Sequence, residues 1–221
     1  MIMNSDYDSE IQQIIVNLLD EKIDNKSQLE IFPDHKYSLG GMVKEISYNQ
    51  QKIKILAILK EANDPDANPI REYVRNIVEK NENLIRTWRN VSRWVTAVYS
   101  NGNCNFEDID ETIERDALEK IAVTNINKGE ASSKTYMPVL KKKALKQSKV
   151  LLKELEILKP NIILCGGTYN IFCEIIEKEG EIGKDYCYFN DILIINMYHP
   201  QARIKDIDMY NSICNILRNL S

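Results

Sequence analysis

Four short apolar runs, each followed by polar or glycine residues, constrain the fold of this chain more than any other feature. They cover residues 53–59, 121–125, 161–165 and 191–196. Helix-like segments separate them, and strands that alternate with helices form right-handed parallel crossovers. The sequence therefore predicts an α/β fold in which helices flank one parallel sheet. In such a sheet, ligands bind outside the carboxyl ends of the strands.

The helices of the first half are predicted from the spacing of apolar residues. Residues 9–23 have an amphipathic pattern, and residues 84–99 place Trp88 and Trp94 on one apolar stripe. This spacing assigns both tryptophans to the core rather than to base stacking. Residues 32–42 contain proline and glycines, so we expect a loop there.

The helices of the second half are predicted mainly from capping residues. Pro138 is suited to the first turn of a long helix that runs to about Leu158. Thr168 is a candidate cap for the next helix, and Asp206 or Asp208 for the last one.

Polar side chains or glycines follow each predicted strand. Glu61 follows the first strand, Asn125 ends the second, Gly166 and Gly167 follow the third, and His199 follows the fourth. Because the carboxyl ends of parallel strands share one edge, we expect these residues to converge on one pocket. A carboxylate directly after a buried strand must be either solvated or specifically paired. Asparagine and glycine at strand ends are more often turn formers.

Three strings near these strand ends form a set. Residues 198–200 read Y-H-P, with Arg203 shortly after them, residues 123–128 read V-T-N-I-N-K, and residues 159–166 read K-P-N-I-I-L-C-G. Their order and spacing resemble the uracil-DNA glycosylase superfamily, in particular the T-N-x-x-K and K-P-x-x-I-x-x-x-G motifs of its thermostable iron–sulfur branch. The resemblance covers roughly residues 50–220. It implies a three-layer sandwich with a four-stranded parallel sheet in the order 2-1-3-4.

The first motif of the superfamily aligns in two ways. Anchored on the strand end, residues 60–63 (K-E-A-N) align with the branch string G-E-A-P, which keeps the acid at Glu61 but replaces the opening glycine and the proline. Anchored on residues 63–65, the chain is similar to the Q-D-P of the uracil-specific branch, and Asp64 becomes the acid that activates water. The strand end sets the register, which favours Glu61, and Asp64 remains the alternative. The excised base is left open by this difference.

The resemblance also implies a role for each residue of the site. His199 would donate a hydrogen bond to the departing base, where one such donor in a water-poor pocket is worth about 3 to 4 kcal/mol. Glu61, or otherwise Asp64, would hold the attacking water or oppose the positive charge on the sugar. The amide of Asn125 would read the base edge. The two glycines would let the backbone approach a phosphate at the start of the next helix. The predicted substrate-binding residues are Asn63, Asn125, Gly166, Gly167 and Tyr198.

Charge bears on whether the partner is DNA. The net charge of −4 is unusual for a protein that neutralises phosphates. However, seven lysines lie between residues 134 and 153 with no acid among them, while acids are concentrated in residues 107–119. The basic run is either a solvated helix face or a DNA-binding face. The predicted DNA-binding residues are Lys128, Lys141, Lys142, Lys143, Gln201 and Arg203.

Length and composition agree with one enzyme domain. The chain has 221 residues, of which 43% are hydrophobic and 28% charged, as in ordinary globular proteins. We expect a single domain over residues 1–221, with residues 1–50 as an extension packed on it, and a cytosolic monomer without metal or cofactor. No apolar run approaches the length of a membrane span. The five cysteines form no C-x-x-C pair and match none of the iron–sulfur positions, so we expect buried thiols.

The sequence thus predicts a DNA glycosylase that flips a damaged or modified base from the duplex and hydrolyses its N-glycosidic bond. Uracil is the default base, and a modified base of phage DNA is the alternative, so the role could be in base-excision repair or in phage defence. A second possibility is a catalytically silent protein of this fold that binds nucleic acid or a protein partner. A third is an enzyme that acts on free nucleosides.

Overall fold

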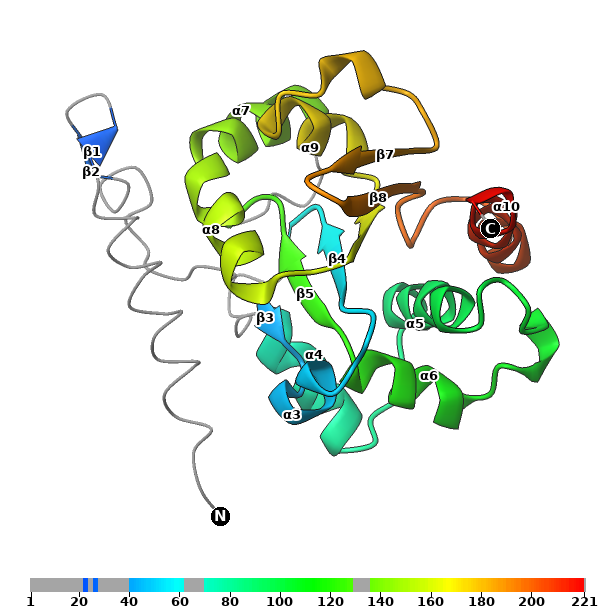
Figure 1. Ribbon diagram of the computed structural model, residues 1–221. Helices are drawn as coiled ribbons and strands as arrows, with labels where there is room; N and C mark the ends of the chain where they lie inside the picture. Colours follow the sequence, from blue (N-terminus) through cyan, green and yellow to red (C-terminus); the bar gives the residue numbers. More distant parts are fainter. Residues whose placement is uncertain (1–21, 24–25, 28–39, 62–69, 129–135, 221) are drawn as a thin grey trace.

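The computed structural model describes residues 22–23, 26–27, 40–61, 70–128 and 136–220. Its main sheet has six strands in the order β3-β5-β4-β6-β8-β7 (Figure 1). A separate two-stranded ladder pairs β1 (Lys22–Ile23) with β2 (Lys26–Ser27). The expected α/β class is confirmed. The strands of the main sheet are β3 (Gly41–Met42), β4 (Ile55–Leu59), β5 (Ala122–Asn125), β6 (Ile162–Gly166), β7 (Tyr186–Phe189) and β8 (Ile192–Met197).

Helices cover both faces of this sheet (Figure 1). On one face lie α4 (Ile70–Glu79), α5 (Arg86–Tyr99), α6 (Glu111–Glu119) and α10 (Asp206–Leu220). On the other lie α7 (Met137–Lys146), α8 (Ser148–Leu158) and α9 (Tyr169–Ile175). The shorter elements are α3 (Glu45–Asn49) and the 3-10 turns η1 (Phe106–Asp108) and η2 (Glu179–Glu181).

The core consists of two hydrophobic clusters, one on each face of the sheet. Along β4, Ile55, Ala57 and Leu59 belong to the cluster under α4, α5 and α10. The alternate residues Leu56 and Ile58 belong to the cluster under α7, α8 and α9. All five are buried, as expected for a parallel strand that is covered on both faces. The apolar runs of the sequence are therefore central strands.

The prediction of an all-parallel sheet of four strands is wrong, because the sheet has one further antiparallel strand at each edge. The four expected strands are β4, β5, β6 and β8, which are parallel neighbours in the order β5-β4-β6-β8. Strands β3 and β7 add an antiparallel edge on each side. Strand β7 reaches β8 through a two-residue turn at Asn190 and Asp191, which have φ of 47° and 64°. Positive φ at both positions is typical of a tight hairpin turn.

Two further expectations are corrected by the structure. The long helix predicted for residues 138–158 is two helices that break at Gln147, where φ is −101° and ψ is 8°. The hydroxyl of Thr168 donates to the carbonyl of Ile58 at 2.9 Å and makes no capping bond. By contrast, α5 forms as predicted, and both Trp88 and Trp94 are buried.

The predicted amino-terminal helix falls mostly outside the described residues, as do Asn63 and Asp64. Its last two positions, Lys22 and Ile23, form β1 instead. Gly41 and Met42, expected in a loop, form β3. Asp206 is the first residue of α10 and binds Arg86.

Among the described helices, none is long and apolar enough to cross a membrane. The five cysteines are free thiols, four of them buried and Cys104 half-buried. Burial raises the pKa of Cys165 well above its ordinary value. Burial and neighbouring thiols raise the pKa of Cys173 to about 12. Cys165 and Cys173 are therefore protonated and act as small core side chains.

Candidate active site

The carboxyl ends of β4 and β5 form one side of the site. Leu59 pairs with Asn125 in the parallel register. Pairing continues beyond the strands, because the backbone amide of Ile126 donates to the carbonyl of Leu59 at 2.8 Å and that of Asn127 to Lys60 at 3.0 Å. The residues that follow the two strands are therefore held in fixed relative positions.

Glu61 is oriented by a buried amide. Its Oε2 accepts a hydrogen bond from Nδ2 of Asn127 at 3.0 Å. Asn127 is fully buried, whereas Glu61 is half-buried and keeps access to solvent. A carboxylate can accept several hydrogen bonds, so the bond from Asn127 fixes its orientation without using all of its acceptor sites. Asn127 is an unspecified position of the T-N-x-x-K string, so the motif predicted no role for it.

Asn125 is buried at the end of β5. Alternation along the strand places it on the same face as Val123, whose side chain packs in the cluster under α4 and α5. It is two residues before Asn127, so the two amides follow the same alternation. The structure thus places Asn125 at the end of β5 and Glu61 after the end of the adjacent strand β4. That both share one pocket with His199 stays a prediction.

His199 occupies the loop after β8 in a defined protonation state. Its Nδ1 accepts a hydrogen bond from the backbone amide of Gln201 at 3.2 Å. Burial, and secondly the charge of Lys60, lower the pKa of His199 below its ordinary value of 6.5. The ring is therefore neutral at pH 7 and carries its proton on Nε2. It can donate one hydrogen bond to a ligand.

Helix α5 holds the histidine loop in place. Asn90 is buried and donates from Nδ2 to the carbonyl of Pro200 at 2.8 Å and to Asp206 Oδ1 at 3.2 Å. Nε2 of Gln201 donates to the hydroxyl of Thr87 at 2.9 Å. Gln201, one of the predicted DNA-binding residues, is thus bound to the protein in this structure. The sequence gives no sign of these supports, because they join residues more than one hundred positions apart.

Gly166 and Gly167 are both required by local packing. A Cβ on Gly166 would lie 2.6 Å from Leu59 Cδ2 and 3.3 Å from Pro200 Cδ. Gly167 has a φ of +72°, and its amide donates to the carbonyl of Met197 at 2.8 Å. The two glycines let the histidine loop lie directly against the ends of β4 and β6.

Lys128 is in the protein interior, which does not agree with its expected contact to DNA. Its side chain is 0% exposed, and Nζ lies 2.5 Å from Glu154 Oε2. Thr124 also binds both groups, and the amide of Gly40 donates to the second oxygen of Glu154 at 3.0 Å. Burial lowers the pKa of Lys128, and Glu154 opposes that effect. Lys128 therefore supports β5 and its following loop.

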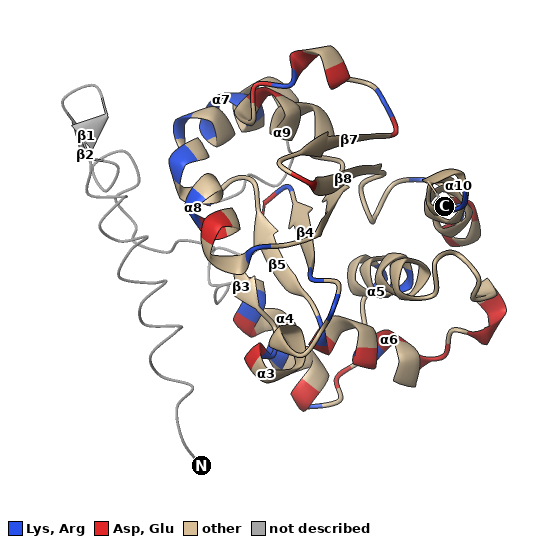
Figure 2. Cartoon of the chain, viewed as in Figure 1, with Lys and Arg blue, Asp and Glu red and all other residues tan. Residues whose placement is uncertain are grey.

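Helices α7 and α8 carry the predicted basic face. Figure 2 shows basic residues along both helices and a group of acidic residues around α6 and η1, with further acidic residues on α8 and around η2. Lys142 is exposed, but Nζ of Lys141 pairs with Glu174 at 2.8 Å. Arg203, which follows the histidine loop, is exposed. The basic face thus exists, although part of its charge is neutralised within the protein.

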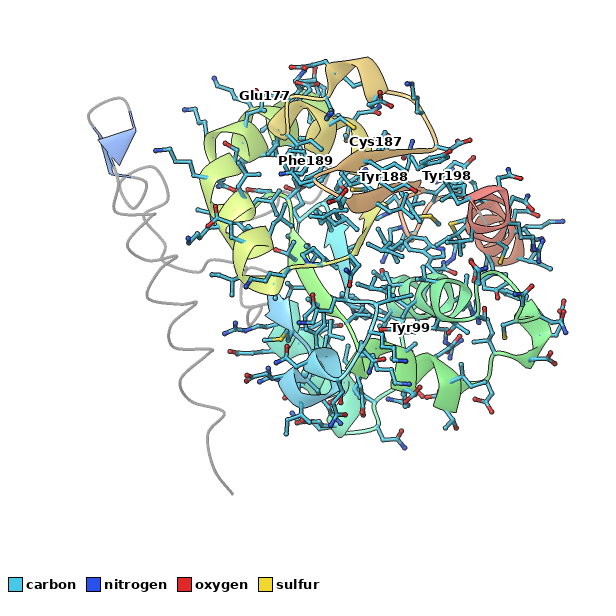
Figure 3. All side chains as sticks on the ribbon, in the orientation of Figure 1. Tyr99, Glu177, Cys187, Tyr188, Phe189 and Tyr198 are labelled. Carbon is cyan, nitrogen blue, oxygen red and sulfur yellow. The ribbon has the colours of Figure 1, made fainter. Side chains whose placement is uncertain are left out.

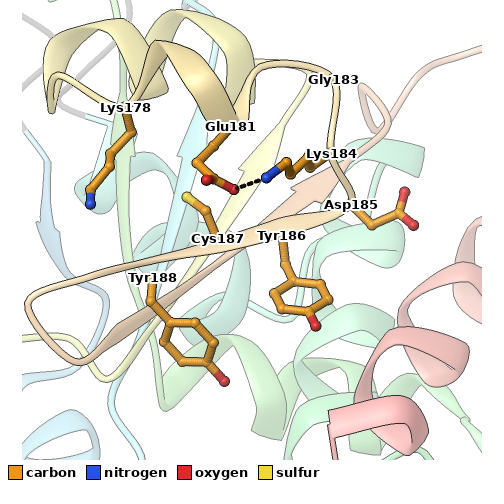
Figure 4. A pocket seen from close by; sticks show the side chains of 8 residues that line it. All are labelled: Lys178, Glu181, Gly183, Lys184, Asp185, Tyr186, Cys187 and Tyr188. Carbon is orange, nitrogen blue, oxygen red and sulfur yellow. Dashed lines mark ion pairs between the residues drawn. The ribbon is translucent and has the colours of Figure 1, made fainter.

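Tyr198 lies beside a cavity that none of Glu61, Asn125 and His199 lines. It is half exposed and, with Asp185 and residues of α10, lines a space of about 340 Å³ (Figure 3). A second cavity of about 640 Å³ shares Asp185 with the first and extends along the start of β7 (Figure 4). Figure 4 also shows the ion pair between Lys184 and Glu181 at its rim. Neither cavity is lined by Glu61, Asn125 or His199.

Together, the fold and the site define an α/β protein with a neutral imidazole donor, an oriented carboxylate and a buried amide at the carboxyl edge of its sheet. Such a set can carry out acid–base chemistry on a bound substrate. No group of three or more potential metal ligands occurs among the described residues. No protein-family model matches the chain, and no significantly similar curated protein is found.

Proposed function

We propose that this protein is a DNA glycosylase that flips a damaged or modified base out of the duplex and hydrolyses its N-glycosidic bond. Uracil is the base we propose first. The resemblance of the strand-end motifs supports this activity, together with the positions of those residues at one sheet edge.

The hydrogen bond that Nδ1 of His199 accepts from the backbone amide of Gln201 is the observation that carries the proposal. Cleavage of an N-glycosidic bond places negative charge on the departing base and positive charge on the sugar. A neutral imidazole that donates from Nε2 stabilises the first charge without requiring a proton to be lost. The hydrogen bond from Gln201 to Nδ1 leaves Nε2 as the donor.

Glu61 supplies the complementary group. Its carboxylate, held by Asn127 at 3.0 Å, would orient the attacking water or oppose the charge on the sugar. Asn125 would bind the edge of the base. A buried amide recognises a specific pattern of donors and acceptors, because a mismatched base leaves its groups unsatisfied.

The experiment is to incubate the protein with duplexes that each carry one altered base and then to cleave abasic sites with alkali. Strand breaks at uracil or at another altered base are the expected result, and the Glu61→Gln variant should not produce them. Binding of duplexes without any abasic site would favour the silent binding protein. Hydrolysis of free nucleosides without action on duplexes would favour the third function, which requires no basic face.

A further inference from the structure

Lys60 is a site residue to which the sequence motifs assign no function. It directly follows β4, and its side chain extends across the end of the neighbouring strand β6. A Cβ on Gly167 would be 3.1 Å from Lys60 Cε and 3.1 Å from His199 Cβ. The side chains of Lys60 and His199 therefore meet over the same glycine. A side chain at position 167 would keep them apart.

The charge of Lys60 acts on the imidazole. Besides burial, Lys60 is the group that lowers the pKa of His199. Lys60 is half-buried, and no carboxylate among the described residues forms an ion pair with it. The side chain of Lys60 thus passes beside that of His199, and its charge is near enough to affect the imidazole. A cation and a neutral N–H donor together match an anionic oxygen better than a neutral or positively charged ligand.

We propose that Lys60 and His199 together bind the anionic oxygen of the departing base, an inference that rests on the proposed glycosylase activity. During the reaction the C1′–N1 bond breaks, and both electrons remain on the base. A water oxygen bonds to C1′, and the proton of this water passes to Glu61. The base leaves as an anion whose charge is shared with its 2-oxo group, and it later takes a proton from solvent.

This arrangement specifies the class of substrate. In a 2-oxo-pyrimidine, such as uracil or a 5-substituted uracil, the carbonyl next to the glycosidic nitrogen gains negative charge as the bond breaks. A purine such as adenine has no such oxygen and leaves most easily after it has been protonated. A fixed ammonium group next to the base opposes that protonation. The site therefore selects pyrimidines with acidic N1 positions.

The test compares Lys60→Met with the wild-type protein on duplexes that carry uracil, 5-hydroxymethyluracil or 5-fluorouracil. Single-turnover excision of uracil should fall about 100-fold, as expected for loss of one charge-stabilising donor. The loss should be smallest for 5-fluorouracil, because its anion is the most stable and needs the least help. Lys60→Arg should keep most of the activity. Lys60→Gln is the second uncharged variant if methionine lowers stability.

Lys54→Met is the matched control, because Lys54 precedes the same strand at its opposite end and contacts Asn49 and the ring of Tyr48. It should leave all three rates unchanged. Equal losses for the three bases in Lys60→Met, or no loss, would overturn the inference. If the wild-type protein excises no base, the proposed function itself is wrong.

A measurement without activity tests the same contact. The chain has two histidines, so the imidazole signals of His199 can be assigned by NMR with the His35→Asn variant. Lys60→Met should raise the pKa of His199 towards its ordinary value, and Lys54→Met should not. An unchanged pKa in Lys60→Met would show that the ammonium group does not lie beside the ring.

Discussion

At the scale of single residues, two substitutions test the proposed roles of His199 and Glu61. His199→Ala removes the donor to the base, and Glu61→Gln removes the negative charge near the water and the sugar. Each should reduce single-turnover excision by at least about 100-fold, since each acts on charge that develops in the transition state. Thermal unfolding should change little. Full activity of Glu61→Gln combined with inactivity of Asp64→Asn would show that Asp64 is the acid.

The protonation of His199 predicts the pH dependence of both rate and stability. Burial and Lys60 lower the pKa of His199 from 6.5. Excision should therefore be constant near pH 7 and fall only as the pH drops through this lowered pKa. In the unfolded chain, the His199 ring takes up a proton near pH 6.5. The contribution of this ring to the free energy of unfolding is therefore fully present above pH 6.5. It is lost progressively as the pH falls from 6.5 to the lowered pKa of the folded state. An acid limb above pH 6.5 in the kcat/KM profile would contradict this prediction.

Residues of the site could be predicted when their proposed roles depend on neighbouring sequence, and were missed when they depend on contacts between distant segments. Glu61, Asn125 and His199 were found because each is an ionisable or amide group next to a strand end. The role of Lys60 was missed, since it depends on β6 lying between β4 and β8 and on Gly167. Asn90 was missed because it lies in α5, far in the sequence from Pro200, to whose carbonyl it donates.

At the scale of secondary-structure elements, the buried pair of Lys128 and Glu154 links β5 to α8. Lys128→Met should destabilise the protein by about 3 to 5 kcal/mol, because it leaves the carboxylate of Glu154 buried without its cation. The double variant Lys128→Met with Glu154→Leu should recover much of this loss. Chemical denaturation measures both effects. A stable Lys128→Met single variant would mean that the pair is not buried in solution.

The elements that sequence patterns identified well are those with long apolar signals. Helix α5 and the strands β4, β5 and β6 bury most of their side chains, so their patterns are strong. The strand β7 was missed because only one of its four residues, Cys187, is buried. The break between α7 and α8 was missed because Gln147 leaves the helix to accept a bond from the amide of Lys128 at 2.7 Å. This is a tertiary contact.

At the scale of the whole molecule, charge is separated between two sides of the protein. Basic residues lie along α7 and α8, and the largest group of acidic residues lies around α6 and η1, although further acidic residues lie on α8 and around η2 (Figure 2). A net charge of −4 therefore does not describe the surface that DNA would meet. The acidic side would repel the phosphate backbone, so the separation would also orient the protein as it approaches a duplex.

Reversal of the basic face tests whether this surface binds DNA. Changing Lys141, Lys142 and Lys143 to glutamate should weaken duplex binding for all sequences and reduce the slope of log affinity against log salt by up to about 3 units, since each lost phosphate contact removes about 0.9. The pairing of Lys141 with Glu174 would lower its contribution to this slope.

The control for this reversal changes Lys44, Lys52 and Lys120 to glutamate, which alters the net charge equally at the amino-terminal edge of the sheet. This variant should keep the wild-type salt slope, because these lysines lie at the opposite edge from the proposed site. Arg203→Ala should slow excision more than it weakens binding, because a group near the extruded base acts mainly during flipping. Equal effects of the two triple variants would show that net charge, rather than the α7 face, determines binding. Binding that ignores salt would exclude DNA as the substrate.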